Sequence, residues 1–181
     1  MSKTLNLVGL CGSLRAGSYN RLLLREGARL FGPSNFVEGN LRLPLLDEDQ
    51  ATPDFPPDVA LLKDQVANAD AVLIATPEYN KAPPGVLKNA LDWLSLRGAP
   101  LVDKPVAIVS AAGGRAGGER SQYMLRWMLV PFRARVLPAP EVLVAVPKGE
   151  FGSDGRLTSD RYIRTLEELM QALRATALTR P

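Results

Sequence analysis

The amino-acid sequence predicts an α/β fold, in which a five-stranded parallel sheet carries helices on both faces. Short apolar segments alternate with helix-like segments from end to end, which is the order of repeated βαβ units. Segments 71–75 and 105–110 carry no charge, as expected of strands buried on both faces. The 181 residues contain no repeat and no linker-like stretch, so we expect one domain spanning residues 1–181.

The strands are predicted from apolar runs bounded by Gly, Pro or polar residues. They are expected at 5–10, 36–41, 71–75 and 105–110, and as a broken fifth strand at 136–137 and 142–145. The partly polar composition of 36–41 favours a sheet edge, and Pro138 and Pro140 interrupt the fifth strand. Five parallel strands with right-handed crossovers favour the flavodoxin-like order 2-1-3-4-5.

The helices are predicted from apolar residues at helical spacing. They are expected at 19–31, 58–68, 84–96, 118–132 and 159–175, with a proline-broken loop at 44–57. Pro131 should kink or end the fourth helix, and Ser159 or Thr158 should cap the last one. The apolar face of the third helix is broad, which leaves two alternatives: packing within the chain or partly against another subunit.

The chain has no histidine and a single cysteine, Cys11. Nucleophilic machinery that uses an imidazole base is therefore excluded, and so are zinc and iron sites that need histidine ligands. We expect no metal site and no disulfide, and we interpret Cys11 as a buried packing residue. The absence of a long apolar run and of a convincing signal peptide favours a cytoplasmic protein without a membrane segment.

The formal charge is +3, from 22 basic and 19 acidic residues. The basic residues are scattered singly and accompany no nucleic-acid-binding motif, so we expect no nucleic-acid partner. A small phosphorylated ligand is the better match for a mildly positive field.

Ligands of open α/β sheets bind beyond the carboxyl ends of the strands. Three loops should lie there, at 11–18, 76–83 and 110–118. The first combines glycines with Ser13, Arg15 and Ser18 directly before a helix, which suits a terminal phosphate monoester. Ser18 stands where a Walker A loop has its lysine, so an NTPase is not favoured. The structural alternative is an ordinary polar helix cap.

The second and third loops suit a flat ring. Three prolines stiffen residues 77–84, where Lys81 could line a lip for an anionic second substrate. The third loop consists almost entirely of Gly and Ala, so the backbone can approach a planar ligand closely. Each loop alone has a purely structural alternative, but together they predict a pocket for flavin mononucleotide (FMN).

Three segments carry a resemblance to a known family. GSLRAGSYNR, PEYNKAPPGVLKNALDWLS and SAAGGRAGGERSQYMLR are similar to the NADPH-dependent FMN reductase family, which includes quinone, azo-dye and chromate reductases. The resemblance covers residues 4–145 and implies a flavodoxin-like fold with tightly held FMN. Lys81 and Pro131 depart from the family pattern, and Lys81 bears on the choice of acceptor.

The resemblance also implies a set of cofactor-binding residues. The phosphate side comprises Ser13, Arg15, Ser18 and Asn20, and Tyr19 is a further cofactor-binding residue. The ring and ribityl side comprises Pro77, Glu78, Tyr79, Asn80, Ser110, Gly113 and Gly114. Arg120, Tyr123 and Glu141 are either solvated surface residues or, as the family suggests, part of a polar network between subunits.

The predicted function is an NAD(P)H-dependent oxidoreductase. FMN would take hydride from NADPH or NADH and pass it on to a quinone-like, azo or other small acceptor, or to free flavin. We expect no catalytic side chain in the strict sense, and a homodimer or a dimer of dimers. The alternatives are a flavodoxin-type electron carrier with a protein partner, which the sequence pI near 9.2 disfavours, and a flavin-free anion-binding domain.

Overall fold

A computed structural model describes residues 4–50 and 54–179, and its strands form one parallel sheet. The strands are β1 Leu5–Cys11, β2 Ser34–Gly39, β3 Ala71–Thr76, β4 Pro105–Ala112, β5 Arg135–Val136 and β6 Val142–Ala145. The order is β2-β1-β3-β4-β5, and β6 also pairs with β4. The predicted order 2-1-3-4-5 is thus confirmed, and so is the fifth strand in two pieces.

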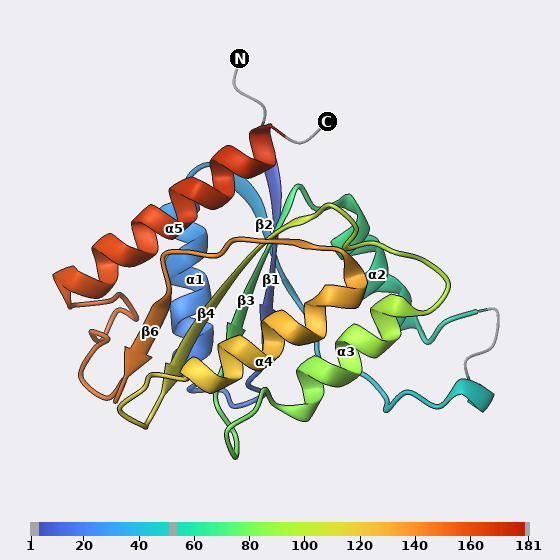
Figure 1. Cartoon of the computed structure of the whole chain (residues 1–181), viewed down its shortest axis with the longest axis horizontal. Coiled ribbons are helices and arrows are strands. Elements are labelled where there is room, and N and C mark those ends of the chain that lie inside the picture. The colour runs from blue at the N-terminus through green and yellow to red at the C-terminus, as the bar shows by residue number, and fades with distance from the viewer. Residues whose placement is uncertain (1–3, 51–53, 180–181) are drawn as a thin grey trace.

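Five α-helices cover both faces of the sheet (Figure 1). They are α1 Tyr19–Phe31, α2 Pro57–Asn68, α3 Gly85–Ser95, α4 Glu119–Leu129 and α5 Asp160–Leu178. Helices α1 and α5 lie on one face, and α2, α3 and α4 lie on the other. Within the described residues, no helix combines the length and the apolar character that crossing a membrane requires.

Alternate residues of the central strands enter two separate cores. On β3, Leu73 faces the core under α1 and α5, whereas Val72 and Ile74 face the core under α2, α3 and α4. This period of two, with both faces apolar, is what a central parallel strand requires. The arrangement fixes the carboxyl ends of β1, β3, β4 and β6 along one edge of the sheet.

The observed elements differ from the predictions mainly at their ends. Strand β2 lies two residues earlier than expected, because the pairing with β1 ends at Gly39. Helix α4 ends at Leu129, and Pro131 lies in the short 3-10 helix Val130–Phe132, as the proline predicted. Helix α5 continues to Leu178, and Ser159 takes the N-cap position without a side-chain hydrogen bond.

Two further expectations are decided by burial and local structure. The broad apolar face of α3 is buried within the chain, since its apolar residues are at most 2% exposed; these are Leu87, Ala90, Leu91, Trp93 and Leu94. The alternative that these residues pack partly against another subunit is therefore wrong. The expected loop at 44–57 contains the 3-10 helix Glu48–Gln50, and its residues 51–53 lie outside the described residues.

Candidate active site

The three predicted loops meet at one edge of the sheet, around a cavity of about 300 Å³. We name them the β1–α1 loop (12–18), the β3–α3 loop (77–84) and the β4–α4 loop (113–118). The residues that line the cavity are Ser13, Arg15, Ser18, Tyr19, Asn20, Pro77, Glu78, Tyr79, Ala111, Ala112, Gly113, Val146, Pro147 and Lys148. A second hollow of about 280 Å³ shares Glu78, Ala112 and Gly113 and extends along the β4–α4 loop.

One end of the cavity lies at the N-terminus of α1. Ser18 is the N-cap, and its Oγ accepts a hydrogen bond from the amide of Arg21 at 3.4 Å. The amides of Tyr19 and Asn20 occupy the first two helical positions, where no acceptor exists within the helix. Free amides and the positive end of the helix dipole favour an anion at this end.

Ser13 and Arg15 complete this end of the cavity. The Ser13 side chain is buried and its Oγ accepts from the amide of Arg15 at 3.4 Å, which leaves its hydroxyl hydrogen for another acceptor. Arg15 is exposed and lines the cavity, so its guanidinium can pair with a ligand anion. This combination of donors fits a phosphate group.

Asn20 differs from the prediction, because its side chain is already occupied. Its Nδ2 donates to the carbonyl of Ala111 at 2.8 Å, and its Oδ1 accepts from the Ala111 amide at 2.9 Å. One of its two Nδ2 hydrogens and its Oδ1 are therefore engaged, and what Asn20 can still offer toward the cavity is the second Nδ2 hydrogen and its backbone amide. The pair of bonds instead joins the start of α1 to the end of β4.

The β3–α3 loop is a tight turn. Tyr79 and Ala82 exchange two backbone hydrogen bonds of 2.9 and 3.1 Å, and the two residues between them have positive φ, 52° at Asn80 and 67° at Lys81. Pro77, Glu78 and Tyr79 line the cavity, whereas Asn80 and Lys81 are exposed at the tip of the turn and do not. The contact of Asn80 with the ring and the lip position of Lys81 stay predictions, with both side chains placed outside the cavity lining.

Glu78 has the partners that a largely buried carboxylate needs. Its side chain is 16% exposed, lies 3.9 Å from the guanidinium of Arg120, and accepts from the amide of Ser121 at 3.4 Å. The Ser121 hydroxyl also donates to the carbonyl of Pro77 at 2.9 Å. The start of α4 therefore holds the β3–α3 loop in place.

The β4–α4 loop offers backbone instead of side chains. A Cβ added at Gly113 or Gly114 would meet no atom within 4 Å, so neither glycine is required by packing inside the protein. A Cβ at Gly117 would lie 2.7 Å from the backbone of Leu143. The first half of the loop is thus bare toward open space, as a planar ligand requires, and the second half is close-packed.

Ser110 was expected to contact the ligand, but it is fully buried on β4. Its hydroxyl donates to the carbonyl of Gly117 at 2.6 Å and accepts from Gln122 Nε2 at 2.9 Å. Strand β4 continues two residues past Ser110, so this side chain lies inside the sheet layer and does not reach the cavity. Its role is to hold the β4–α4 loop.

The structure also adds a segment that the sequence reasoning missed. Val146, Pro147 and Lys148 follow β6 and line the cavity beside Tyr19. The position of this segment in the sequence could have predicted it, because every loop that follows a strand of a parallel sheet lies at the same edge of that sheet. Lys148 is exposed and adds a second cation to the lining of the cavity that also holds Arg15.

The residues present fit FMN. A phosphate can lie against the free amides of α1 with Arg15 beside it, and a flat ring can lie against the bare surface at Gly113 and Gly114 with Tyr79 at its edge. Within residues 4–50 and 54–179, no group of three or more Asp, Glu, Cys or His side chains is placed to hold a metal ion. The chemistry of the site is that of an anion and ring pocket.

Comparisons with known proteins agree with this geometry. The family model described as NADPH-dependent FMN reductase matches residues 5–148. The chain is 41% identical over 176 residues to an NAD(P)H-dependent FMN reductase of Pseudomonas aeruginosa, covering 96% of this chain and 95% of that protein. It is 44% identical over 151 residues to a quinone reductase of Escherichia coli, covering 81% and 80% of the two proteins.

A solved structure gives the same result. The flavoenzyme NAD(P)H:(acceptor) oxidoreductase FerB of Paracoccus denitrificans superposes with a TM-score of 0.88 at 28% identity, covering 97% of this chain and 98% of that one. The family expected from the three sequence motifs is confirmed. The chain belongs to the NADPH-dependent FMN reductase family, whose members are pyridine-nucleotide-dependent flavin oxidoreductases.

Proposed function

We propose that the cavity holds FMN with its phosphate at the N-terminus of α1, and that reduced pyridine nucleotide and then a small acceptor react at the open face of the ring. The observation that carries this proposal is the contrast between the two ends of one cavity. One end presents amides, hydroxyls and Arg15, and the other presents a glycine surface with no side chain in the way.

The phosphate contacts come from the β1–α1 loop and the first turn of α1. Ser13 and Ser18 contribute hydroxyl groups, Arg15 contributes a charge-assisted hydrogen bond, and Tyr19 and Asn20 contribute backbone amides. These groups carry no proton that the reaction consumes. Their role is to bind and orient the cofactor.

The ring contacts come from Pro77, Glu78 and Tyr79 on one side and from Gly113 and Gly114 on the other. FMN held between these residues would supply the hydride chemistry between NADPH or NADH and an acceptor. Backbone amides of the two loops stabilise the negative charge that develops on the ring. With no histidine in the chain, we assign no catalytic acid or base.

We propose quinone-like or azo compounds, or free flavin, as acceptors. Relatives named quinone reductase in Escherichia coli and NAD(P)H:quinone oxidoreductase in Solanum tuberosum, which is 39% identical over 185 residues, support this class. An open ring face selects by size and planarity more than by specific hydrogen bonds, so several acceptors should be reduced. Comparing steady-state rates for a quinone, an azo dye and free FMN, each with NADPH and NADH, ranks them.

Anaerobic stopped-flow mixing of the purified protein with NADPH or NADH tests the reaction. We expect rapid bleaching of the flavin absorbance, followed by its return on adding a quinone. Flavin absorbance without bleaching would indicate an electron carrier instead of an enzyme. A protein that binds no flavin would be an anion-binding domain.

A double variant tests the proposed position of the phosphate. Replacing both Arg15 and Ser18 by Ala removes one charge-assisted donor and one hydroxyl, so FMN affinity should fall about 10- to 100-fold. Equilibrium dialysis of the double variant against FMN measures this. Unchanged FMN affinity would contradict the phosphate position.

We further propose a homodimer, or a dimer of such dimers, assembled through α4. This helix exposes Trp127 (82%), Tyr123 (51%) and Met124 (46%), and the 3-10 helix that follows it exposes Val130 (71%). An apolar groove of about 280 Å³ lies between α3 and this end of α4. Apolar patches of this kind mark interaction surfaces. Analytical ultracentrifugation should show a dimer or tetramer, and Trp127→Asp should shift it toward the monomer.

The remaining assignments follow from the same observations. We propose a single-domain protein, because the six strands found in residues 4–50 and 54–179 belong to one sheet. We also propose a cytoplasmic location without a nucleic-acid partner, in keeping with one buried cysteine and scattered basic residues. Cell fractionation and a salt-dependent DNA-binding assay test these two assignments.

A further inference from the structure

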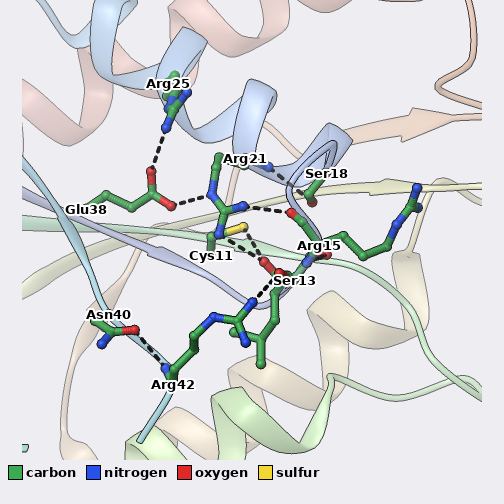
Figure 2. A network of polar contacts seen from close by, with 10 residues as sticks. Cys11, Ser13, Arg15, Ser18, Arg21, Arg25, Glu38, Asn40 and Arg42 are labelled. Atoms are coloured by element: carbon green, nitrogen blue, oxygen red, sulfur yellow. Dashed lines mark hydrogen bonds and ion pairs between the residues drawn. The ribbon is translucent and has the colours of Figure 1, made fainter. Parts of the chain in front are cut away.

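Arginine side chains hold carbonyl groups of the β1–α1 loop (Figure 2). Arg21 donates from Nη1 to the carbonyl of Arg15 at 2.7 Å and from Nη2 to that of Ser13 at 3.3 Å. Arg42 donates from Nη2 to the carbonyl of Leu14 at 2.8 Å. Three consecutive peptide carbonyls are thus bound by two guanidinium groups.

These bonds fix the direction in which the loop amides point. In a trans peptide the carbonyl and the following N–H point in opposite directions. Binding the carbonyls of Ser13, Leu14 and Arg15 on one side therefore turns the amides of residues 14–16 toward the other side. A carbonyl turned the other way would present a partial negative charge to a phosphate.

The two arginines lie on the opposite side of the loop from the cavity. Together with Cys11, Leu14 and Glu38, they line a separate hollow of about 350 Å³. Neither lines the cavity of the candidate site. They act on the ligand site through the loop, so they are not ligand contacts themselves.

Glu38 on β2 holds Arg21 in position. Arg21 Nε lies 2.6 Å from Glu38 Oε1, and this hydrogen bond raises the pKa of the guanidinium. Both side chains are mostly shielded, with 21% and 24% exposure. Each of the three nitrogens of Arg21 therefore has a donor role, one to Glu38 and two to the loop.

Arg25 provides a matched comparison within the same cluster. Its Nη2 reaches the other oxygen of Glu38 at 3.4 Å, and its side chain is 62% exposed. No hydrogen bond joins it to a carbonyl of the β1–α1 loop in the described part of the chain. Arg21 and Arg25 thus share a partner and a charge, but only Arg21 touches the loop.

We propose that Arg21, oriented by Glu38, and Arg42 are positioning residues that set the preference of the site for FMN over riboflavin. They hold the carbonyls of Ser13, Leu14 and Arg15 away from the phosphate, and so present the amides of Leu14 and Ala16 to it, while the amide of Arg15 donates to Ser13 Oγ. The inference rests on the proposed FMN function, because it assumes that a phosphate lies at this loop.

The test is a titration of the flavin-free full chain with FMN and with riboflavin, followed by quenching of flavin fluorescence. Wild type should bind FMN more tightly than riboflavin. Arg21→Met should weaken FMN binding about tenfold or more, the equivalent of one charge-assisted interaction. The riboflavin affinity of Arg21→Met should stay within about twofold of the wild-type value, because riboflavin has no phosphate for the loop to bind. A difference of that size is within experimental scatter.

Further variants separate positioning from charge. Arg25→Met should leave both affinities unchanged, and Arg42→Met should give a smaller loss of FMN affinity, since Arg42 holds a single carbonyl. Arg21→Lys keeps the charge but lacks the planar fork that binds two carbonyls, so it should remain defective. Full recovery in Arg21→Lys would show that charge alone matters and would overturn the proposal.

The outcomes distinguish this inference from the function on which it rests. If wild type binds FMN and riboflavin equally, the phosphate position itself is wrong. If wild type prefers FMN and Arg21→Met keeps the same preference, only the positioning role is wrong. Should Arg21→Met not fold, Glu38→Gln and Arg42→Met decide, because an unchanged FMN-to-riboflavin ratio in both overturns the proposal.

Discussion

The β1–α1 loop and the β4–α4 loop form the two ends of one cavity, but they are shaped by opposite means. The first is held by side chains, with guanidinium groups on three successive carbonyls. The second is shaped by glycines, and Ser110 holds it through the carbonyl of Gly117. A phosphate needs donors in fixed directions, whereas a ring needs a flat surface from which side chains are missing.

The β4–α4 loop is itself divided. Gly113 and Gly114 border open space, so packing within the protein does not require glycine there, and these are the glycines proposed to face the ring. Gly117 and Gly118 have φ of +61° and +97°, and a Cβ added at either would lie within 3 Å of neighbouring atoms, so the fold itself requires glycine there. The same residue type thus answers two different requirements within six residues.

The largest effect should come from the half of the loop that serves the fold. In Gly117→Ala, the new Cβ would lie 2.7 Å from the backbone of Leu143, which has no flexible end to move away, and the positive φ adds strain. We expect a loss of about 3 kcal/mol or more in the free energy of unfolding. Urea denaturation measures this free energy. An unfolding midpoint equal to that of wild type would show that the loop relaxes freely around the added methyl group.

The next largest effect should come from the pair of hydrogen bonds between the start of α1 and the end of β4, the elements that flank the two loops. Asn20→Ala leaves the amide and the carbonyl of Ala111 buried without their partner, which should cost about 2 kcal/mol of stability. Asn35→Ala is the control, because Asn35 is exposed and should change stability by less than about 0.5 kcal/mol. Equal midpoints for the two variants would mean that α1 and β4 are not coupled through Asn20.

Gly113→Ala should separate ligand binding from folding. Its Cβ would enter open space and φ at this position is not positive, so the free energy of unfolding should stay within about 0.5 kcal/mol of wild type. The methyl group would occupy the surface proposed for the ring, and FMN affinity should fall about tenfold, as for one overpacked contact. Wild-type FMN affinity would place the ring elsewhere.

The sequence predicted the fold well because its signals are local. Apolar runs such as 71–75 and Pro131 at a helix end act through their neighbours along the chain. The site was predicted at the level of loops for the same reason. A strand that ends in glycines and is followed by a helix locates a binding loop wherever the rest of the chain lies.

Individual side-chain roles were harder to predict because they depend on partners far away in the sequence. Asn20 is occupied by Ala111, 91 residues away, and Ser110 is occupied because β4 continues to Ala112. Arg21 and Arg42 gave no signal at all, since isolated arginines resemble solvated surface residues until the loop carbonyls are placed beside them.

The smallest effect concerns Cys11, which lies at the base of the β1–α1 loop and reports on how tightly that loop is closed. Its thiol is 3% exposed and donates to the carbonyl of Ser13 at 3.5 Å, and burial raises its pKa. At a given pH the folded protein therefore holds less reactive thiolate than an exposed cysteine does, so alkylation should be slow at neutral pH.

The raised pKa also sets the sign of the pH dependence. Protonated Cys11 favours the folded state below the unfolded pKa of about 8.5, and this contribution is lost as the pH rises through the higher folded pKa. Alkylation should speed up over the same range. Arg42→Met should speed it at neutral pH by loosening the β1–α1 loop, whereas Gly113→Ala, at the other end of the cavity, should not. Equal rates in these two variants would show that the arginines do not hold the loop closed.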